Sequence, residues 1–148
     1  MYAFVAPTRP RSVQAKHTVR YKTAIREAFL KYVPDPERLS APLYGVVYYF
    51  HNVKTDTDAD NISKPVWDSL EGTAFDDDRS IRWRVAGVFD LTSGGVEVLD
   101  VTRVPEAVLA DLYEMIDTRD HFIYVEFGRL HTPMYRFGLE EHDDGDQH

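Results

Sequence analysis

The chain has 148 residues, a formal net charge of −8 and no cysteine. A chain of this length fits one domain, which can fold without a disulfide or a structural metal. The lack of cysteine excludes disulfides, thiolate metal sites and cysteine nucleophiles. No stretch approaches the roughly 20 consecutive apolar residues of a membrane helix, so we expect a soluble, cytoplasmic protein with no membrane partner.

The first part of the chain predicts a strand, a helix and a second strand. Residues 2–5 form a short apolar run, which is typical of a strand. Between residues 14 and 31, apolar side chains recur every three or four positions, which predicts an amphipathic helix. Residues 43–51 (LYGVVYYFH) are rich in β-branched and aromatic side chains and predict a central strand.

The remainder of the chain alternates between helical and extended patterns. We expect, in order, a helix over 63–71, a strand over 81–89, a turn at 93–95, its hairpin partner over 96–101, a helix over 105–116, and short strands over 121–127 and 134–139. The polar tail over 140–148 is typical of a disordered segment. This order of elements predicts an α+β fold, with a mixed β-sheet and helices packed on at least one face.

Positive charge is concentrated near the N-terminus. Residues 1–31 contain seven Lys or Arg and one acid, Glu27, which gives +6, and the remaining residues carry −14. A basic segment can bind phosphate on one surface while acidic clusters bind metal on another. We expect DNA contacts from Arg9, Arg11, Lys16 and Arg20, although a solvated helix face with an acidic solubilising tail accounts for the charges equally well.

Two groups of aspartates flank the helix expected over 63–71. Asp58 and Asp60 precede it, and Asp77 and Asp78 lie in the loop before the next strand. The two segments can meet at one end of adjacent strands, and converging carboxylates repel one another unless a cation lies between them. Mg²⁺ or Mn²⁺ prefers such oxygen ligands, can activate water and can stabilise charge on a phosphate.

The aspartates before this helix match a calcium-binding EF-hand loop only in part. With Asp56 in the first position, Asn61 stands where glycine is required and Trp67 where glutamate is required, which argues against that motif. Lys64 lies four residues after Asp60 and four before Asp68. It can therefore contact a scissile phosphate or form a structural salt bridge, and spacing alone leaves both possibilities open.

The segment from Asp58 to Leu70, DADNISKPVWDSL, resembles the D-x-D-N-x-x-K-x-x-x-D-x-L motif of the RusA family of Holliday junction resolvases. The family's following D-D-x-x-I/V element resembles Asp77 to Ile81, and the register of Ile81 selects Asp78 over Asp76. The resemblance implies a RusA-like endonuclease core over residues 1–102. Residues 103–139 would then be a C-terminal extension of the same domain, followed by the acidic tail 140–148.

The resemblance implies a homodimer that binds four-way junctions or other branched DNA and cuts phosphodiester bonds with Mg²⁺ or Mn²⁺. By position, Asp58, Asp60 and Asp78 resemble the family's catalytic metal ligands, with Asp77 as a further candidate ligand. Lys64 resembles its catalytic lysine. Two alternatives stay open: a DNA- or partner-binding subunit with little or no nuclease activity, and a metal-dependent hydrolase of nucleotides or other phosphate esters.

Overall fold

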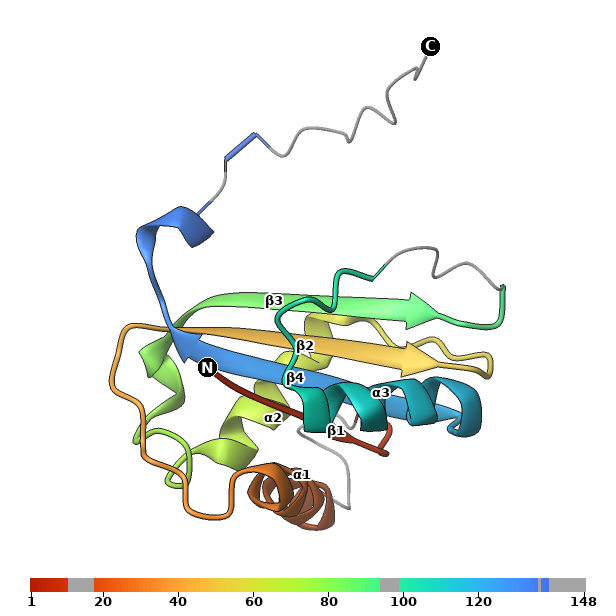
Figure 1. The fold of residues 1–148 in the computed structure, drawn as a ribbon, viewed down its shortest axis with the longest axis horizontal. Helices are drawn as coiled ribbons and strands as arrows, with labels where there is room; N and C mark the ends of the chain where they lie inside the picture. Colours follow the sequence, from red (N-terminus) through yellow and green to blue (C-terminus); the bar gives the residue numbers. More distant parts are fainter. Residues whose placement is uncertain (11–17, 94–98, 136, 139–148) are drawn as a thin grey trace.

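The computed structural model describes residues 1–10, 18–93, 99–135 and 137–138 (Figure 1). Their elements follow in the order β1 (Tyr2–Ala6), α1 (Thr18–Tyr32), β2 (Leu43–His51), η1 (Ala59–Asn61), α2 (Ser63–Leu70), η2 (Asp78–Ser80), β3 (Ile81–Asp90), α3 (Glu106–Thr118), β4 (His121–Arg129) and η3 (Thr132–Met134), where η marks a 3₁₀ turn. Helices cover a mixed sheet, so the predicted α+β class is confirmed.

The sheet of the described residues has four strands in the order β1-β4-β2-β3. Strand β4 is antiparallel to both β1 and β2, whereas β2 and β3 are parallel. A parallel pair requires a crossover connection, and α2 lies within it. The segment expected to be a C-terminal extension therefore contributes β4 to the middle of the sheet, and the boundary at residue 102 stays a prediction.

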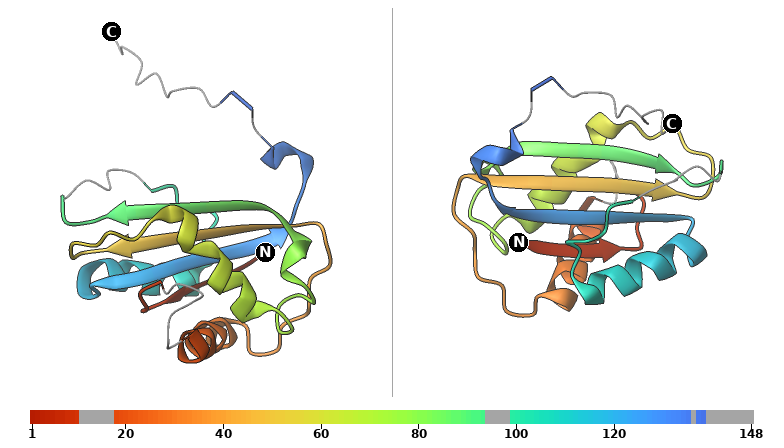
Figure 2. Two further views of the ribbon diagram at one scale, coloured as in Figure 1. Left: turned by 180° about the vertical axis from the view of Figure 1, so that it is seen from behind. Right: turned by 45° about the horizontal axis from the view of Figure 1, so that its top comes forward.

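Side chains on the two faces of the sheet form two separate cores. On one face, Phe4, Val47 and Val125 pack beneath α1 and α2. On the other, Phe50 and Phe122 pack beneath α3. Figure 2 shows α2 in front of the sheet in its left view, whereas α3 lies in front of it in Figure 1. Because β2 is covered on both faces, its sequence is a continuous apolar run rather than an alternating one.

Helix α2 lies unusually close to strand β2. Trp67 is fully buried, and a Cβ atom added to Gly45 would be 2.4 Å from Trp67 Cζ2. Glycine is therefore the residue that lets the indole ring rest on the β2 backbone. Pro65 occupies the third position of α2, where no intrahelical donor is lost, and Gly72 follows the helix with a φ of 83°. These contacts fix α2, and with it Lys64, relative to the sheet.

Two of the expected strands are wrong over the residues that are described. Residues 99–101 of the predicted hairpin partner are not in a strand, because Leu99 and Val101 pack against the core beneath α3 instead of pairing with β3; residues 94–98 lie outside the described residues. In the strand expected over 134–139, Met134 ends η3 and Gly138 has a φ of 64°. Pro133 directly precedes Met134 and has no backbone N–H to donate to a neighbouring strand. Residues 136 and 139 are not described.

We expect Gly45→Ala to lower the free energy of unfolding by about 1–3 kcal/mol, because the new methyl group forces Trp67 off the sheet. Gly87→Ala is the matched control, since its Cβ would meet Tyr48 Cδ1 at 3.1 Å. Urea denaturation of both variants measures the difference. An equal loss of stability in the two would contradict the role assigned to Gly45.

Candidate functional site

The first acidic segment forms the entrance to α2. Asp58 caps η1, where its Oδ1 accepts a hydrogen bond of 3.1 Å from the backbone N–H of Asp60. Both side chains are exposed, and η1 contacts β3. Lys64 lies in the first turn of α2 and donates from Nζ to Asp68 Oδ1 at 3.3 Å. The structural salt bridge considered for Lys64 is therefore present.

The second acidic segment forms η2, immediately before β3. Asp77 caps this turn by accepting a 2.8 Å hydrogen bond from the backbone N–H of Arg79. The Arg79 guanidinium also donates to both carboxylate oxygens of Asp77, from Nε at 3.1 and 2.9 Å and from Nη2 at 2.6 Å. These hydrogen bonds, with the Arg79 side chain contributing most, lower the pKa of Asp77 to about 2. Asp77 thus has a defined structural partner.

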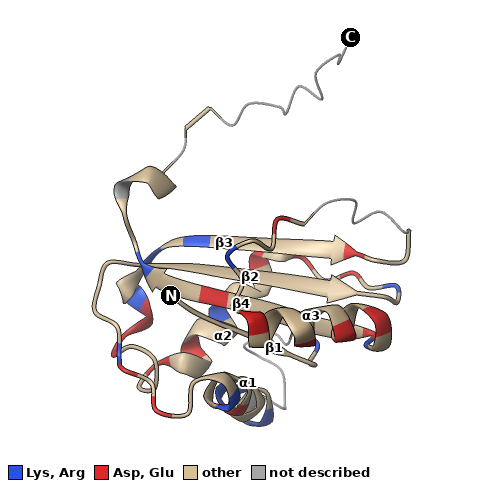
Figure 3. Cartoon of the chain, viewed as in Figure 1, with Lys and Arg blue, Asp and Glu red and all other residues tan. Residues whose placement is uncertain are grey.

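Asp78 joins the two segments. Its Oδ2 lies 3.8 Å from Lys64 Nζ and 3.5 Å from Arg84 Nη2. Its backbone N–H donates to Glu71 Oε1 at 3.1 Å. The start of α2 and the η2 turn are therefore adjacent. Figure 3 shows acidic and basic residues close together in the segment that leads into β3.

The carboxylates come together differently from the expected set. Within the described residues, the group of three potential ligands whose oxygens lie within 4.8 Å of one another is Glu71, Asp77 and Asp78. Asp58 and Asp60 lie outside that group. The metal role of Asp58, Asp60, Asp77 and Asp78 stays a prediction.

The chemistry of the donors fits a hard divalent cation. All candidate ligands are carboxylate oxygens, which Mg²⁺ and Mn²⁺ prefer. Asp78 Oδ2 already has two cationic side chains within 4 Å, and these offset its negative charge. The sequence does not predict the contacts of Glu71 and Arg84 with Asp78. Glu71 lies at the end of a helix and Arg84 six residues past Asp78, and only the folded loops bring both to Asp78.

The expected DNA-binding residues lie on or near α1 where they are described. Arg9 and Arg20 are exposed, whereas Arg11 and Lys16 lie outside the described residues. Helix α1 packs against α2 on the same face of the sheet (Figure 2). The structure is therefore compatible with a nucleic acid that crosses both helices.

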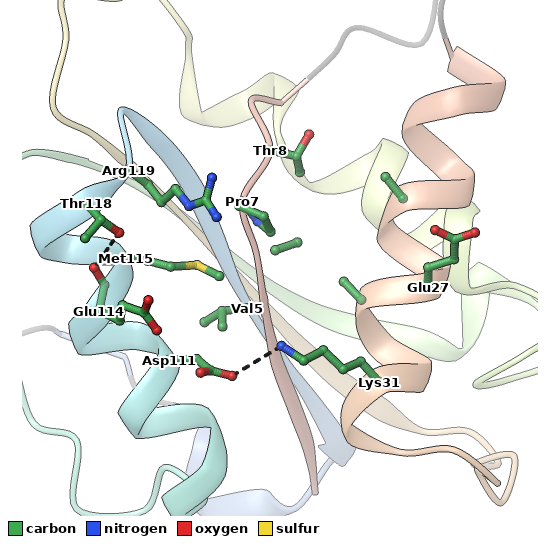
Figure 4. A pocket seen from close by; sticks show the side chains of 13 residues that line it. Val5, Pro7, Thr8, Glu27, Lys31, Asp111, Glu114, Met115, Thr118 and Arg119 are labelled. Atoms are coloured by element: carbon green, nitrogen blue, oxygen red, sulfur yellow. Dashed lines mark hydrogen bonds and ion pairs between the residues drawn. The ribbon is translucent and has the colours of Figure 1, made fainter.

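A separate cavity of about 530 Å³ lies beside β1, between α1 and α3 (Figure 4). Lys31 of α1 and Asp111 of α3 form an ion pair across it, with Nζ and Oδ2 3.7 Å apart. Tyr32 donates a hydrogen bond to the same carboxylate. The residues that line this cavity include none of the aspartates of the two acidic segments. No helix among the described residues is both long and apolar enough for a membrane span.

The fold and the site together define a small α+β domain with acidic and basic side chains gathered at one edge of a mixed sheet. Residues 4–99 match the family model described as endodeoxyribonuclease RusA. The match covers more than half of the chain and includes both acidic segments, so the chain belongs to the RusA family of endodeoxyribonucleases. The search of curated proteins found no match.

Proposed function

We propose that this protein is a divalent-metal-dependent endonuclease that cuts phosphodiester bonds in branched DNA, with four-way junctions as the leading substrate. The family match over residues 4–99 supports the endonuclease class. The observation that carries the proposal is the 3.8 Å approach of Lys64 Nζ to Asp78 Oδ2, because it brings the helix that follows Asp58 and Asp60 to the turn that carries Asp78. Metal-dependent cleavage of a phosphodiester bond needs the metal ligands and a phosphate-binding cation close together.

In this proposal Asp58, Asp60 and Asp78 hold the cation, and Asp77 holds the η2 turn in shape through Arg79. A bound Mg²⁺ or Mn²⁺ would supply Lewis-acid stabilisation of the phosphate and lower the pKa of water. Lys64 is suited to contact the phosphate because its side chain is 59% exposed and its contacts with Asp68 and Asp78 are long. An anionic phosphate can draw such an ammonium group away from these partners.

Arg9, Arg20 and the basic face of α1 would bind the backbone of the DNA arms. A junction has paired arms related by symmetry, so a homodimer would place one site on each of two strands. The alternative is a RusA-like subunit that binds DNA or a partner with little cleavage. The position of Asp58 and Asp60 outside the group of close carboxylates is the observation that favours it.

Cleavage of labelled four-way junctions, flaps and duplexes in Mg²⁺ or Mn²⁺ tests the proposal. We expect cleavage of branched substrates and a loss of at least about a hundredfold in Asp60→Asn, since a metal ligand is removed. Asp56→Asn is the matched control, because Asp56 is an exposed acid of the same loop. Junction binding without cleavage would indicate the binding subunit instead, and equal activity of the two variants would refute the site.

The role of α1 in DNA binding has its own test. We expect Arg20→Ala to weaken junction binding and to reduce the slope of log affinity against log salt concentration by about one, as one phosphate contact is lost. Electrophoretic mobility shifts over a range of KCl concentrations measure both quantities. Arg38→Ala serves as the control, because Arg38 pairs with Asp76 through a 2.8 Å contact rather than lying on α1. An unchanged slope in Arg20→Ala would remove α1 from the interface.

A further inference from the structure

Arg84 contacts both the main chain and a side chain of the η2 turn. Its Nη2 donates to the backbone carbonyl of Asp78 at 2.7 Å, and its Nε donates to the backbone carbonyl of Ile81 at 3.1 Å. The same Nη2 lies 3.5 Å from Asp78 Oδ2. One guanidinium therefore binds the beginning of β3 and both the main chain and the side chain of Asp78.

The position of Arg84 depends on an irregularity in the pairing of β2 with β3. Leu43 pairs with Ile81, but Tyr44 pairs with Trp83, so the register shifts by one residue between them. After this shift Arg84 lies opposite Gly45, on the face covered by α2. The shift thus directs the guanidinium back toward the loop that carries Asp78.

Lys64 and Arg84 differ in how firmly they are held. The Arg84 side chain is 30% exposed and has two backbone carbonyls as partners. The Lys64 side chain is 59% exposed, and its polar partners among the described residues are two carboxylates, at 3.3 and 3.8 Å. The lysine can leave Asp78 for another anion, whereas the arginine would have to break its bonds to the main chain.

We propose that Arg84 is a positioning residue that fixes the Asp78 carboxylate for a divalent cation, by clamping the backbone of the η2 turn rather than by contacting DNA. The inference rests on the proposed function in assigning Asp78 a metal. A planar guanidinium with five fixed donors can bridge the carbonyls of Asp78 and Ile81. The single ammonium of lysine has the same charge but cannot span both carbonyls in this geometry.

The experiment compares Arg84→Lys and Arg84→Ala with the wild type in Mn²⁺ binding without DNA, measured by electron paramagnetic resonance of free Mn²⁺. Arg82→Ala is the control, because Arg82 is an exposed arginine two residues away on the same strand. We expect the Mn²⁺ affinity to fall by about tenfold or more in both Arg84 variants, the usual effect of losing a partner that orients a metal ligand. Arg82→Ala should leave the Mn²⁺ affinity unchanged. Junction affinity in metal-free buffer should be unchanged in Arg84→Lys.

The outcomes separate this inference from the proposed function. Wild-type Mn²⁺ affinity in a folded Arg84→Lys variant overturns the inference. A loss of junction affinity with Mn²⁺ binding intact also overturns it, because Arg84 would then be a DNA contact. Circular dichroism establishes folding, and Arg84→Lys carries the test if Arg84→Ala unfolds. Mn²⁺ binding by a wild type that cuts no branched DNA overturns only the proposed function. A wild type that binds no Mn²⁺ overturns both.

Discussion

Compensation of the negative charge on Asp78 holds the site together. The carboxylate lies in a loop with two further acids, Glu71 and Asp77, whose oxygens are within 4.8 Å. Nearby positive charge offsets the repulsion within such a group, and Lys64 and Arg84 supply it. Arg79 does the same for Asp77. These ion pairs offset the negative charge of the loop in the structure.

The hydrophobic core determines where these charges lie. Trp67 rests on the β2 backbone because residue 45 has no side chain, and this contact sets the distance of α2 from the sheet. Lys64 lies one turn before Trp67 on the same short helix. The β2–β3 register shift acts from the other side, since it directs Arg84 toward Asp78. Close packing resists small displacements, so both contacts restrict the separation of the charged groups.

Local patterns were enough to predict most of the elements and the identity of the acidic motif. The apolar run of β2 and the helical spacing of α1 and α3 are properties of neighbouring residues, so the sequence reveals them. Leu99 and Val101 alternate like a strand but bury their side chains beneath α3, and only the tertiary fold decides between these outcomes. The contacts of Arg84 and Glu71 with Asp78 likewise depend on long-range packing and a register shift, which no local pattern encodes.

The proposed activity requires Asp58, Asp60 and Asp78 to hold one cation together. In the structure Asp78 has cationic partners, and Asp58 caps η1 through its Oδ1. The other carboxylate oxygen of Asp58 would turn toward the ion. A crystal structure of the protein soaked in Mn²⁺, with anomalous diffraction to locate the ion, decides whether they do. We predict one ion bound by Asp58, Asp60 and Asp78 together. An ion held by Glu71 and Asp77 without Asp58 or Asp60, or no ion at this edge of the sheet, would contradict the proposed site.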